Sequence, residues 1–281
     1  MSGALSLPKI HTIVSDLDGT LVPHTTFELD ARTIAAFKAA HYAGARIIVA
    51  SGRSSASMKP YVDEIGAGDP YIACNGAQVF AADGALMHEI AMSVEQLRTA
   101  VRWLRARDVY VQAYDEDGFI FDKECVYAER YTKSSGLPCR KVDDLAAFLN
   151  KPAVKLLGVD EPARVTQLLA EARVAFDGHH GLGVLGWSTS EPQFLEISHP
   201  DVSKGSALKW LADKLDFDAE GTLAFGDSIN DLPMLQWAGM SVAVGNAREE
   251  VKACVSRACG SCYDCGPAVM IQQMIMEGCF S

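Results

Sequence analysis

The chain has 281 residues, enough for one large domain or two ordinary ones, and its 49% hydrophobic and 22% charged residues are typical of a soluble globular protein. Its formal net charge of -11 argues against a nucleic-acid partner and against binding to an anionic membrane surface, because both attract basic faces. No apolar run approaches the length of a membrane span, and the N-terminal residues lack the pattern of a signal peptide. We therefore expect a cytoplasmic protein.

The first third of the chain predicts parallel βαβ units. Three short apolar runs, each followed by polar residues, indicate buried strands at residues 10–15, 45–51 and 71–74. Asp30 can cap a helix that extends to about Ala43, and a second helix is expected over about 55–64. This alternation of strands and helices is typical of a parallel sheet.

The pattern changes from about Asp83 onwards. The stretch Val109–Asp122 predicts a hairpin with its turn at Asp117–Gly118. Helices are expected beside it, over about 94–106 and 162–172. This middle part of the chain therefore indicates an α+β module.

The parallel pattern returns after about Ser190. The elements expected there are a helix after Ser203, strands at 222–226 and 241–244, and a helix near 231–237. One α/β domain with an inserted module explains this order better than two tandem domains. We predict a Rossmann-like parallel-sheet core of residues 1–83 and 190–281, with an inserted α+β domain of residues 84–189.

Asp16 and Asp18 stand at the carboxyl end of the first expected strand. Residues two apart on an extended chain point the same way, so the two carboxylates would face one spot and repel each other. Such a pair requires a cation between the carboxylates or a proton on one of them.

Further polar residues follow the other expected strands, at the edge where open α/β sheets bind ligands. They are Ser51, Gly52, Arg53, Asn75, Gly76, Asp227, Asn230 and Asp231. Lys204 lies in the first turn of a helix, where the macrodipole disfavours a cation unless an anion is bound nearby. Each residue alone is typical of a turn or a helix cap. Their coincidence at one sheet edge predicts a binding site.

Four of the eight cysteines are clustered: Cys254, Cys259, Cys262 and Cys265. This spacing could suit an iron–sulfur or zinc site. Free thiols in a reducing cytosol are the simpler interpretation, because a chain of this length can bury a core without disulfides. We therefore expect no metal at these cysteines.

Four segments at expected strand or helix ends form a recognisable set. They are DLDGT (Asp16–Thr20), SGR (Ser51–Arg53), VSKGSAL (Val202–Leu208) and GDSIND (Gly226–Asp231). In this order they resemble the motifs of the haloacid dehalogenase (HAD) superfamily of phosphatases, in particular its Cof-like branch with a large C2-type cap. NGA (Asn75–Ala77) and VGNA (Val244–Ala247) are also similar to that branch. The resemblance spans nearly the whole chain, although the cysteine-rich segment departs from it.

The resemblance implies a phosphatase that acts through an aspartyl-phosphate. Asp16 would be the nucleophile, and Asp18 would protonate the leaving oxygen and then activate water. Asp16, the backbone carbonyl of Asp18 and Asp227 would hold Mg²⁺. Asp231 would orient Lys204 or the metal shell. The groups that would contact the phosphate or the rest of the substrate are Ser51, Arg53, Asn75, Lys204, Asn230 and the amides of Leu17 and Gly52.

The resemblance also makes the inserted domain a cap that contacts the remainder of a small-molecule phosphate ester, such as a sugar phosphate or pyridoxal phosphate. Within this domain, the segment Phe176–Trp187 contains His179 and His180. It is either a substrate-facing loop or an ordinary turn before the last strand of the domain, and both interpretations stay open.

Three classes of function remain. The first is a phosphatase of a small metabolite, and the second is a phosphotransferase of the phosphomannomutase type, which retains its phosphoryl group. The third is a non-catalytic binding protein, against which the intact Asp16, Asp18, Lys204 and Asp227 argue. Release of free phosphate separates the first two classes. We expect a monomer or a homodimer.

Overall fold

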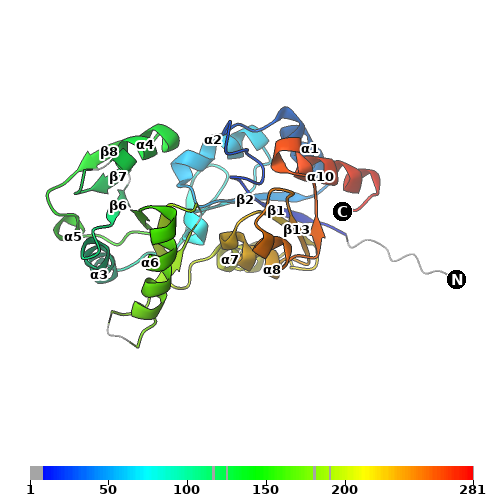
Figure 1. Cartoon of the computed structure of the whole chain (residues 1–281). Helices are drawn as coiled ribbons and strands as arrows, with labels where there is room; N and C mark the ends of the chain where they lie inside the picture. Colours follow the sequence, from blue (N-terminus) through cyan, green and yellow to red (C-terminus); the bar gives the residue numbers. More distant parts are fainter. Residues whose placement is uncertain (1–8, 116–117, 125, 180–181, 190, 281) are drawn as a thin grey trace. The chain divides into compact units, whose positions relative to one another are not determined.

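The computed structural model describes residues 9–115, 118–124, 126–179, 182–189 and 191–280. The chain forms two compact units, which Figure 1 colours by sequence. One unit, called the core below, combines residues 1–87 with 203–281, and the other, called the cap, consists of residues 88–202. The predicted fold class, an α/β core with an inserted α+β domain, is confirmed.

The core is built on an eight-stranded sheet in the order β14-β13-β12-β1-β2-β3-β4-β5. Its strands are β1 (Thr12–Asp16), β2 (Arg46–Ala50), β3 (Tyr71–Ala73), β4 (Gln78–Phe80), β5 (Leu86–Glu89), β12 (Thr222–Gly226), β13 (Met240–Ala243) and β14 (Arg257–Ala258). All neighbours from β14 to β3 pair in parallel, whereas β4 runs antiparallel to β3. Since β1 lies between β2 and β12, its carboxyl end lies in the middle of one sheet edge.

Helices cover both faces of this sheet (Figure 1). One face carries α1 (Ala31–Tyr42), α2 (Ser55–Ile65) and α10 (Gly266–Met276), and the other carries α7 (Lys204–Leu215), α8 (Leu232–Trp237) and α9 (Glu249–Lys252). In β1, Ile13 packs into the first apolar layer and its neighbour Val14 into the second. The strands read as continuous apolar runs because both faces of the sheet are buried.

Two core helices begin where the sequence predicts. The Asp30 carboxylate accepts a hydrogen bond from the backbone N–H of Arg32 at 2.8 Å and caps α1. The Ser203 hydroxyl oxygen accepts from the backbone N–H of Ser206 at 2.9 Å, and the Ser203 N–H donates to the Ser206 hydroxyl in return. This capping box fixes the start of α7, where Lys204 is the first helical residue.

The cap contains a six-stranded sheet in the order β10-β11-β9-β6-β7-β8. Its strands are β6 (Tyr110–Asp115), β7 (Gly118–Phe121), β8 (Cys139–Lys141), β9 (Leu156–Val159), β10 (Gly186–Ser188) and β11 (Phe194–Ser198). Its helices are α3 (Val94–Arg105), α4 (Val126–Ser135), α5 (Leu145–Phe148) and α6 (Pro162–Ala175). Helices α3, α5 and α6 bury one face of the sheet, and α4 packs Tyr127 and Tyr131 against the other. The expected hairpin is present as β6 and β7, although Asp117 lies outside the described residues.

The second boundary of the cap differs from the expected position at residue 190. Strand β11 belongs to the cap because it pairs antiparallel with both β9 and β10. Trp187 lies in β10 and packs against Trp103 and Phe176, with ring centroids 5.4 and 5.0 Å away. It is therefore part of the apolar core of the cap and does not belong to a substrate-facing loop. His180 lies outside the described residues.

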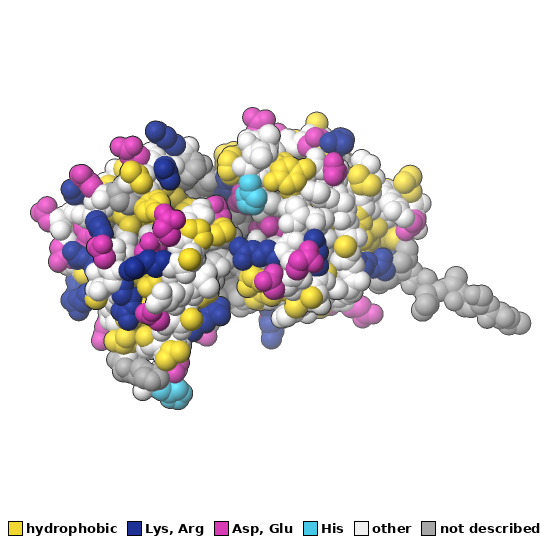
Figure 2. All heavy atoms as spheres, viewed as in Figure 1, with side chains coloured by type: hydrophobic (Ala, Val, Ile, Leu, Met, Phe, Trp, Pro, Cys, Tyr) yellow, Lys and Arg dark blue, Asp and Glu magenta, His cyan; other side chains and the backbone are white. Residues whose placement is uncertain are grey.

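The surface carries charges of both signs. On the face drawn in Figure 2, acidic and basic side chains are interspersed over each unit, and the basic ones do not gather into a stripe. Among the described residues, every helix is too short or too polar to cross a membrane.

Candidate active site

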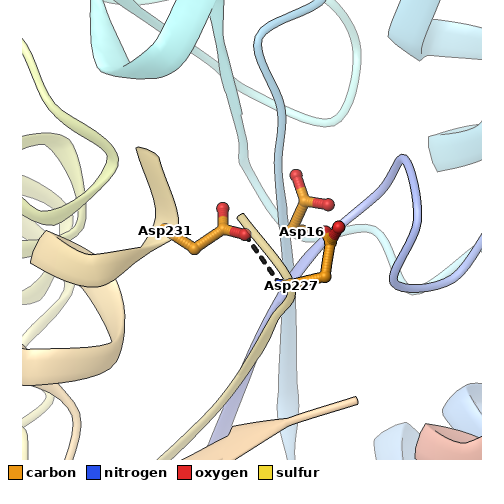
Figure 3. Close-up of side chains that lie close together, drawn as sticks. All are labelled: Asp16, Asp227 and Asp231. Atoms are coloured by element: carbon orange, nitrogen blue, oxygen red, sulfur yellow. Dashed lines mark hydrogen bonds between the residues drawn. The ribbon is translucent and has the colours of Figure 1, made fainter. Parts of the chain in front are cut away.

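Four charged residues converge at the middle of the carboxyl edge of the core sheet. Asp16 ends β1, Asp227 follows β12, and Asp231 closes the short 3-10 helix η2 (Ile229–Asp231). Figure 3 shows their three carboxylates together, and one oxygen of each lies within 4.8 Å of the others. The fourth residue, Lys204, forms ion pairs with Asp16 and, at 2.6 Å, with Asp231. All four side chains are buried.

The oxygen atoms of these carboxylates differ in their hydrogen-bond partners. Both oxygens of Asp231 are taken. Oδ1 accepts from Lys204, and Oδ2 accepts from the backbone N–H of Ser228 at 2.9 Å. Oδ2 also accepts from the backbone N–H of Asp227 at 3.0 Å, which is the bond drawn in Figure 3. The Asp227 carboxylate accepts from the hydroxyls of Thr20 at 3.0 Å and Ser228 at 3.1 Å. Asp16 Oδ1 accepts from Lys204, whereas its buried Oδ2 has no hydrogen-bond partner among the described residues.

The crowded carboxylates shift one another's pKa values. Burial raises the pKa of Asp16 well above its usual value, and the charge of Asp231 adds to this rise, while Lys204 opposes it. Burial and Asp231 likewise raise the pKa of Asp227 to about 6. Burial alone would lower the pKa of Lys204, but the charges of Asp16 and Asp231 outweigh it and raise that pKa. Three carboxylates thus share one ammonium group, and the site carries surplus negative charge.

These residues fit a divalent cation. Carboxylate oxygens are the ligands that Mg²⁺ prefers. Asp16 Oδ2 has no hydrogen-bond partner among the described residues, and one oxygen of Asp16 lies within 4.8 Å of one oxygen of Asp227. A cation at these oxygens would offset the burial and the charge repulsion that raise both pKa values. Asp231 accepts hydrogen bonds from Lys204 and from backbone groups, and its supporting role stays a prediction.

Asp18 lies outside this acidic cluster. Its carboxylate forms a bidentate pair with Arg53, in which Nε donates to Oδ2 at 2.8 Å and Nη2 to Oδ1 at 2.6 Å. The Arg53 guanidinium also lies over the ring of Tyr61, 5.0 Å from its centroid, and donates to the Tyr61 hydroxyl. Ser51 is close to the same pair, with its hydroxyl 3.4 Å from Asp18 Oδ2. Arg53 therefore contacts the predicted acid–base residue directly.

The remaining predicted residues form a third group. Asn230 Nδ2 donates to Asn75 Oδ1 at 2.9 Å, and the Asn75 amide lies against the α-carbon of Gly52. The side chain of Leu17 is fully buried, so only its backbone can serve the site. The structure thus places every predicted residue at this one edge of the core sheet.

Asn246 also lies at this edge, although its sequence pattern predicted no role for it. Asn246 Nδ2 donates to the carbonyl of Gly19 at 2.7 Å, and Asn246 Oδ1 accepts from the backbone N–H of Cys262 at 2.9 Å. It thereby links the loop after β1 to the cysteine-rich segment. The only signal for it in the sequence was its place in the VGNA segment.

The clustered cysteines lie in this linked segment. Among the described residues, the only group of three or more metal-ligating side chains within reach of one ion is Asp16, Asp227 and Asp231. Burial raises the pKa of the Cys259 thiol to about 12 and that of Cys262 to about 11, which disfavours the thiolates that bind metals. The segment is connected to the loop after β1 through the two hydrogen bonds of Asn246.

The family model of the haloacid dehalogenase-like hydrolases matches residues 13–270. The chain belongs to this family. The resemblance to Cof-like phosphatases is confirmed, and the protein is a phosphatase of the HAD type.

Two bacterial relatives are similar over most of their length. The 5-amino-6-(5-phospho-D-ribitylamino)uracil phosphatase YwtE of Bacillus subtilis is 28% identical, over 94% of this chain and 97% of the relative. The pyridoxal phosphate phosphatase YbhA of Escherichia coli is also 28% identical, over 86% of this chain and 90% of the relative. A solved haloacid dehalogenase-like hydrolase from Bacteroides thetaiotaomicron is 25% identical and superposes with a TM-score of 0.82, covering 95% of this chain and 100% of that chain.

Proposed function

We propose that this protein is a Mg²⁺-dependent phosphatase that hydrolyses a small phosphorylated metabolite through an aspartyl-phosphate on Asp16. The observation that carries the proposal is the buried Asp16 carboxylate, with one oxygen on Lys204 and the other without a partner among the described residues. Mg²⁺ held by Asp16, the Asp18 backbone carbonyl and Asp227 would neutralise phosphoryl charge and draw the phosphate to this spot.

The first half-reaction moves the phosphoryl group to Asp16. A carboxylate oxygen of Asp16 forms the new P–O bond while the bond from phosphorus to the substrate oxygen breaks. Lys204 opposes the rise in the pKa of Asp16, which favours the ionised nucleophile, and it offers positive charge to the phosphoryl oxygens. Ser51, Asn230 and the amides of Leu17 and Gly52 donate hydrogen bonds to the same oxygens in this proposal.

The second role falls to Asp18. It gives a proton to the departing substrate oxygen, then takes a proton from the water that hydrolyses the aspartyl-phosphate. The bidentate pair with Arg53 requires the ionised carboxylate. That pairing suits the base step, and Asp18 has to separate from Arg53 when it carries the proton for the acid step.

The substrate class rests on the relatives and on the cap. The two relatives are named for phosphate esters of small metabolites, and we propose the same class here, with sugar phosphates included. The cap, residues 88–202, is proposed to contact the part of the substrate beyond the phosphate.

Release of inorganic phosphate from a broad panel of phosphorylated metabolites, with and without Mg²⁺, tests this function. Asp16→Asn should lower turnover by about 10³-fold or more without unfolding the protein, because an amide is no nucleophile here. The matched control is Asp63→Asn, on the exposed face of α2, which should stay within about twofold of the natural protein. An Asp16→Asn variant with near-normal turnover would overturn the mechanism. Transfer of phosphate between two sugars without release would indicate a phosphomutase instead.

A further inference from the structure

The turn that follows β3, η1 (Cys74–Gly76), has an unusual backbone. Three consecutive residues have positive φ angles: 50° at Cys74, 57° at Asn75 and 101° at Gly76. Asparagine and glycine tolerate this left-handed region, but cysteine rarely adopts it. Such conformations persist only where the surrounding structure imposes them, and they concentrate at functional sites.

The backbone of this turn holds two other parts of the site. The N–H of Cys74 donates to the carbonyl of Arg53 at 2.8 Å, and the N–H of Asn75 donates to the carbonyl of Ser51 at 2.9 Å. On the other side, a Cβ atom at Gly76 would lie 2.1 Å from the carbonyl oxygen of Ser203, so only glycine fits there. The turn thus lies in close contact with the loop that carries Ser51 on one side and with the start of α7, which carries Lys204, on the other.

The side chain of Asn75 contacts a third part of the site, the residue Asn230 after β12. Its Oδ1 accepts from Asn230 Nδ2 at 2.9 Å, across 155 positions of sequence. The same amide lies over Gly52, where an added Cβ would approach Oδ1 to 3.0 Å. Asn230 Oδ1 is buried and has no hydrogen-bond partner among the residues that the structure describes. An arrangement chosen for stability alone would satisfy that oxygen and avoid the left-handed turn.

We propose that Asn75 is a positioning residue for the phosphoryl group, an inference that rests on the proposed function. An amide group is planar, so anchoring one N–H of Asn230 to Asn75 fixes the direction of its second N–H. The backbone of Asn75 meanwhile fixes the Ser51 loop. Asn75 therefore aligns two phosphate-binding elements from opposite ends of the chain. It acts through Asn230 and Ser51 and does not itself contact the substrate.

The test removes the Asn75 amide and leaves the turn intact. Asn75→Gly deletes the side chain at a φ that glycine adopts freely, so the turn is kept, and the lost hydrogen bond with Asn230 should lower the unfolding temperature by only a few degrees. The matched control is Asp216→Gly, at an exposed left-handed residue after α7 with φ of 56°. Each variant is combined with Asn230→Ala. The measurements are the affinity for inorganic phosphate by calorimetry with Mg²⁺ present, and kcat/KM for p-nitrophenyl phosphate.

We expect Asn75→Gly to weaken phosphate binding and kcat/KM by about fivefold or more, and Asp216→Gly to change neither by more than about twofold. In the Asn230→Ala background, Asn75→Gly should lower phosphate affinity and kcat/KM by a smaller factor than it does in the natural protein, because the group that Asn75 positions is already missing. The inference is overturned if the Asn75→Gly variant binds phosphate as tightly as the natural protein does. It is also overturned if the fold-losses of Asn75→Gly and Asn230→Ala simply multiply in the double variant. Because phosphate binding needs no turnover, a protein that released no phosphate but still showed this coupling would contradict only the proposed function.

Discussion

The core and the cap each bury a lysine, and the two sites are built differently. In the core, Lys204 is 1% exposed and pairs with two carboxylates, while a third belongs to the same cluster. In the cap, Lys155 is 8% exposed and pairs with Glu196 at 2.7 Å, with its ammonium 5.6 Å from the ring centroid of Tyr114. Among the described residues, no cluster of three acidic groups surrounds the cap lysine.

The difference lies in the balance of charge. The Lys155–Glu196 pair matches one charge with another beside hydroxyl and amide groups, as a structural ion pair does. The core site holds more negative charge than Lys204 can neutralise, and burial together with the charge of Asp231 raises the pKa values of Asp16 and Asp227. Buried surplus charge is costly unless a ligand of opposite sign completes it. Among the described acidic clusters, it is therefore the carboxylates around Lys204 that outnumber their lysine and leave room for a cation.

The largest expected effect comes from removing each lysine. Lys155→Met would remove the ammonium group that forms an ion pair with the buried Glu196 carboxylate and should cost about 3–5 kcal/mol of cap stability. The double change Lys155→Met with Glu196→Leu should largely restore that stability. Neither should abolish hydrolysis of p-nitrophenyl phosphate in protein that remains folded. Lys204→Met with Asp231→Leu should lose that activity whatever its stability, because the site itself is gone.

Urea denaturation and phosphate release measure the two properties separately. If the cap double variant were as unstable as Lys155→Met alone, the pair would not be a replaceable structural element. If the core double variant kept its activity, the role of Lys204 would be wrong.

Protonation gives a smaller effect that is specific to the core. Because the pKa of Asp227 in the folded protein is raised to about 6, folding favours its protonated form when no metal is bound. The resulting stability is fully present below the ordinary pKa near 4 and is lost as the pH rises through about 6. In a chelator, this group should therefore lower the free energy of unfolding by about 1–3 kcal/mol between about pH 5 and pH 8.

Urea denaturation at both pH values, with Asp227→Asn as the matched control, checks this effect. The decline with pH should be shallower in the variant. Equal slopes in the two proteins would show that Asp227 carries no excess charge.

The smallest effects should come from single hydroxyl groups. Thr20→Val removes the donor to Asp227 and Tyr114→Phe removes the group that donates to Tyr131, so each should cost about 1 kcal/mol of stability. Only Thr20→Val should also weaken Mg²⁺ activation, because its hydroxyl helps to keep Asp227 ionised. Mg²⁺ titration of p-nitrophenyl phosphate hydrolysis distinguishes them. If Tyr114→Phe raised the Mg²⁺ concentration needed for activation as much as Thr20→Val does, the core site would not differ from the cap in this respect.

The sequence predicted the core well because its signals are local. Strand β12 was expected with its observed bounds, Thr222–Gly226, since a buried parallel strand is a continuous apolar run between polar residues. The starts of α1 and α7 followed from Asp30 and Ser203, whose side chains cap the next turn. Parallel topology then brought the polar strand ends together at one edge.

The pairings within the site could not be predicted, because they join residues that are distant in sequence. No local sequence pattern predicts the hydrogen bond between Asn75 and Asn230, or the ion pair between Arg53 and the Asp18 carboxylate. In the cap, the sequence left open whether the segment Phe176–Trp187 faces the substrate, yet its last residue, Trp187, lies in β10 and packs into the apolar core. A shift of one residue in a strand exchanges its faces, and the sequence alone left that register open.

The number of Mg²⁺ ions bound per chain tests the central contrast most directly. Calorimetric titration of the chelator-treated protein should show one saturable Mg²⁺ site per chain in this account. Asp227→Asn should abolish or greatly weaken that site, whereas Glu196→Gln, which changes the buried pair of the cap by the same kind of substitution, should leave it intact. A natural protein with no saturable Mg²⁺ binding would contradict a metal site in the core cluster. So would a site that survives Asp227→Asn and disappears in Glu196→Gln.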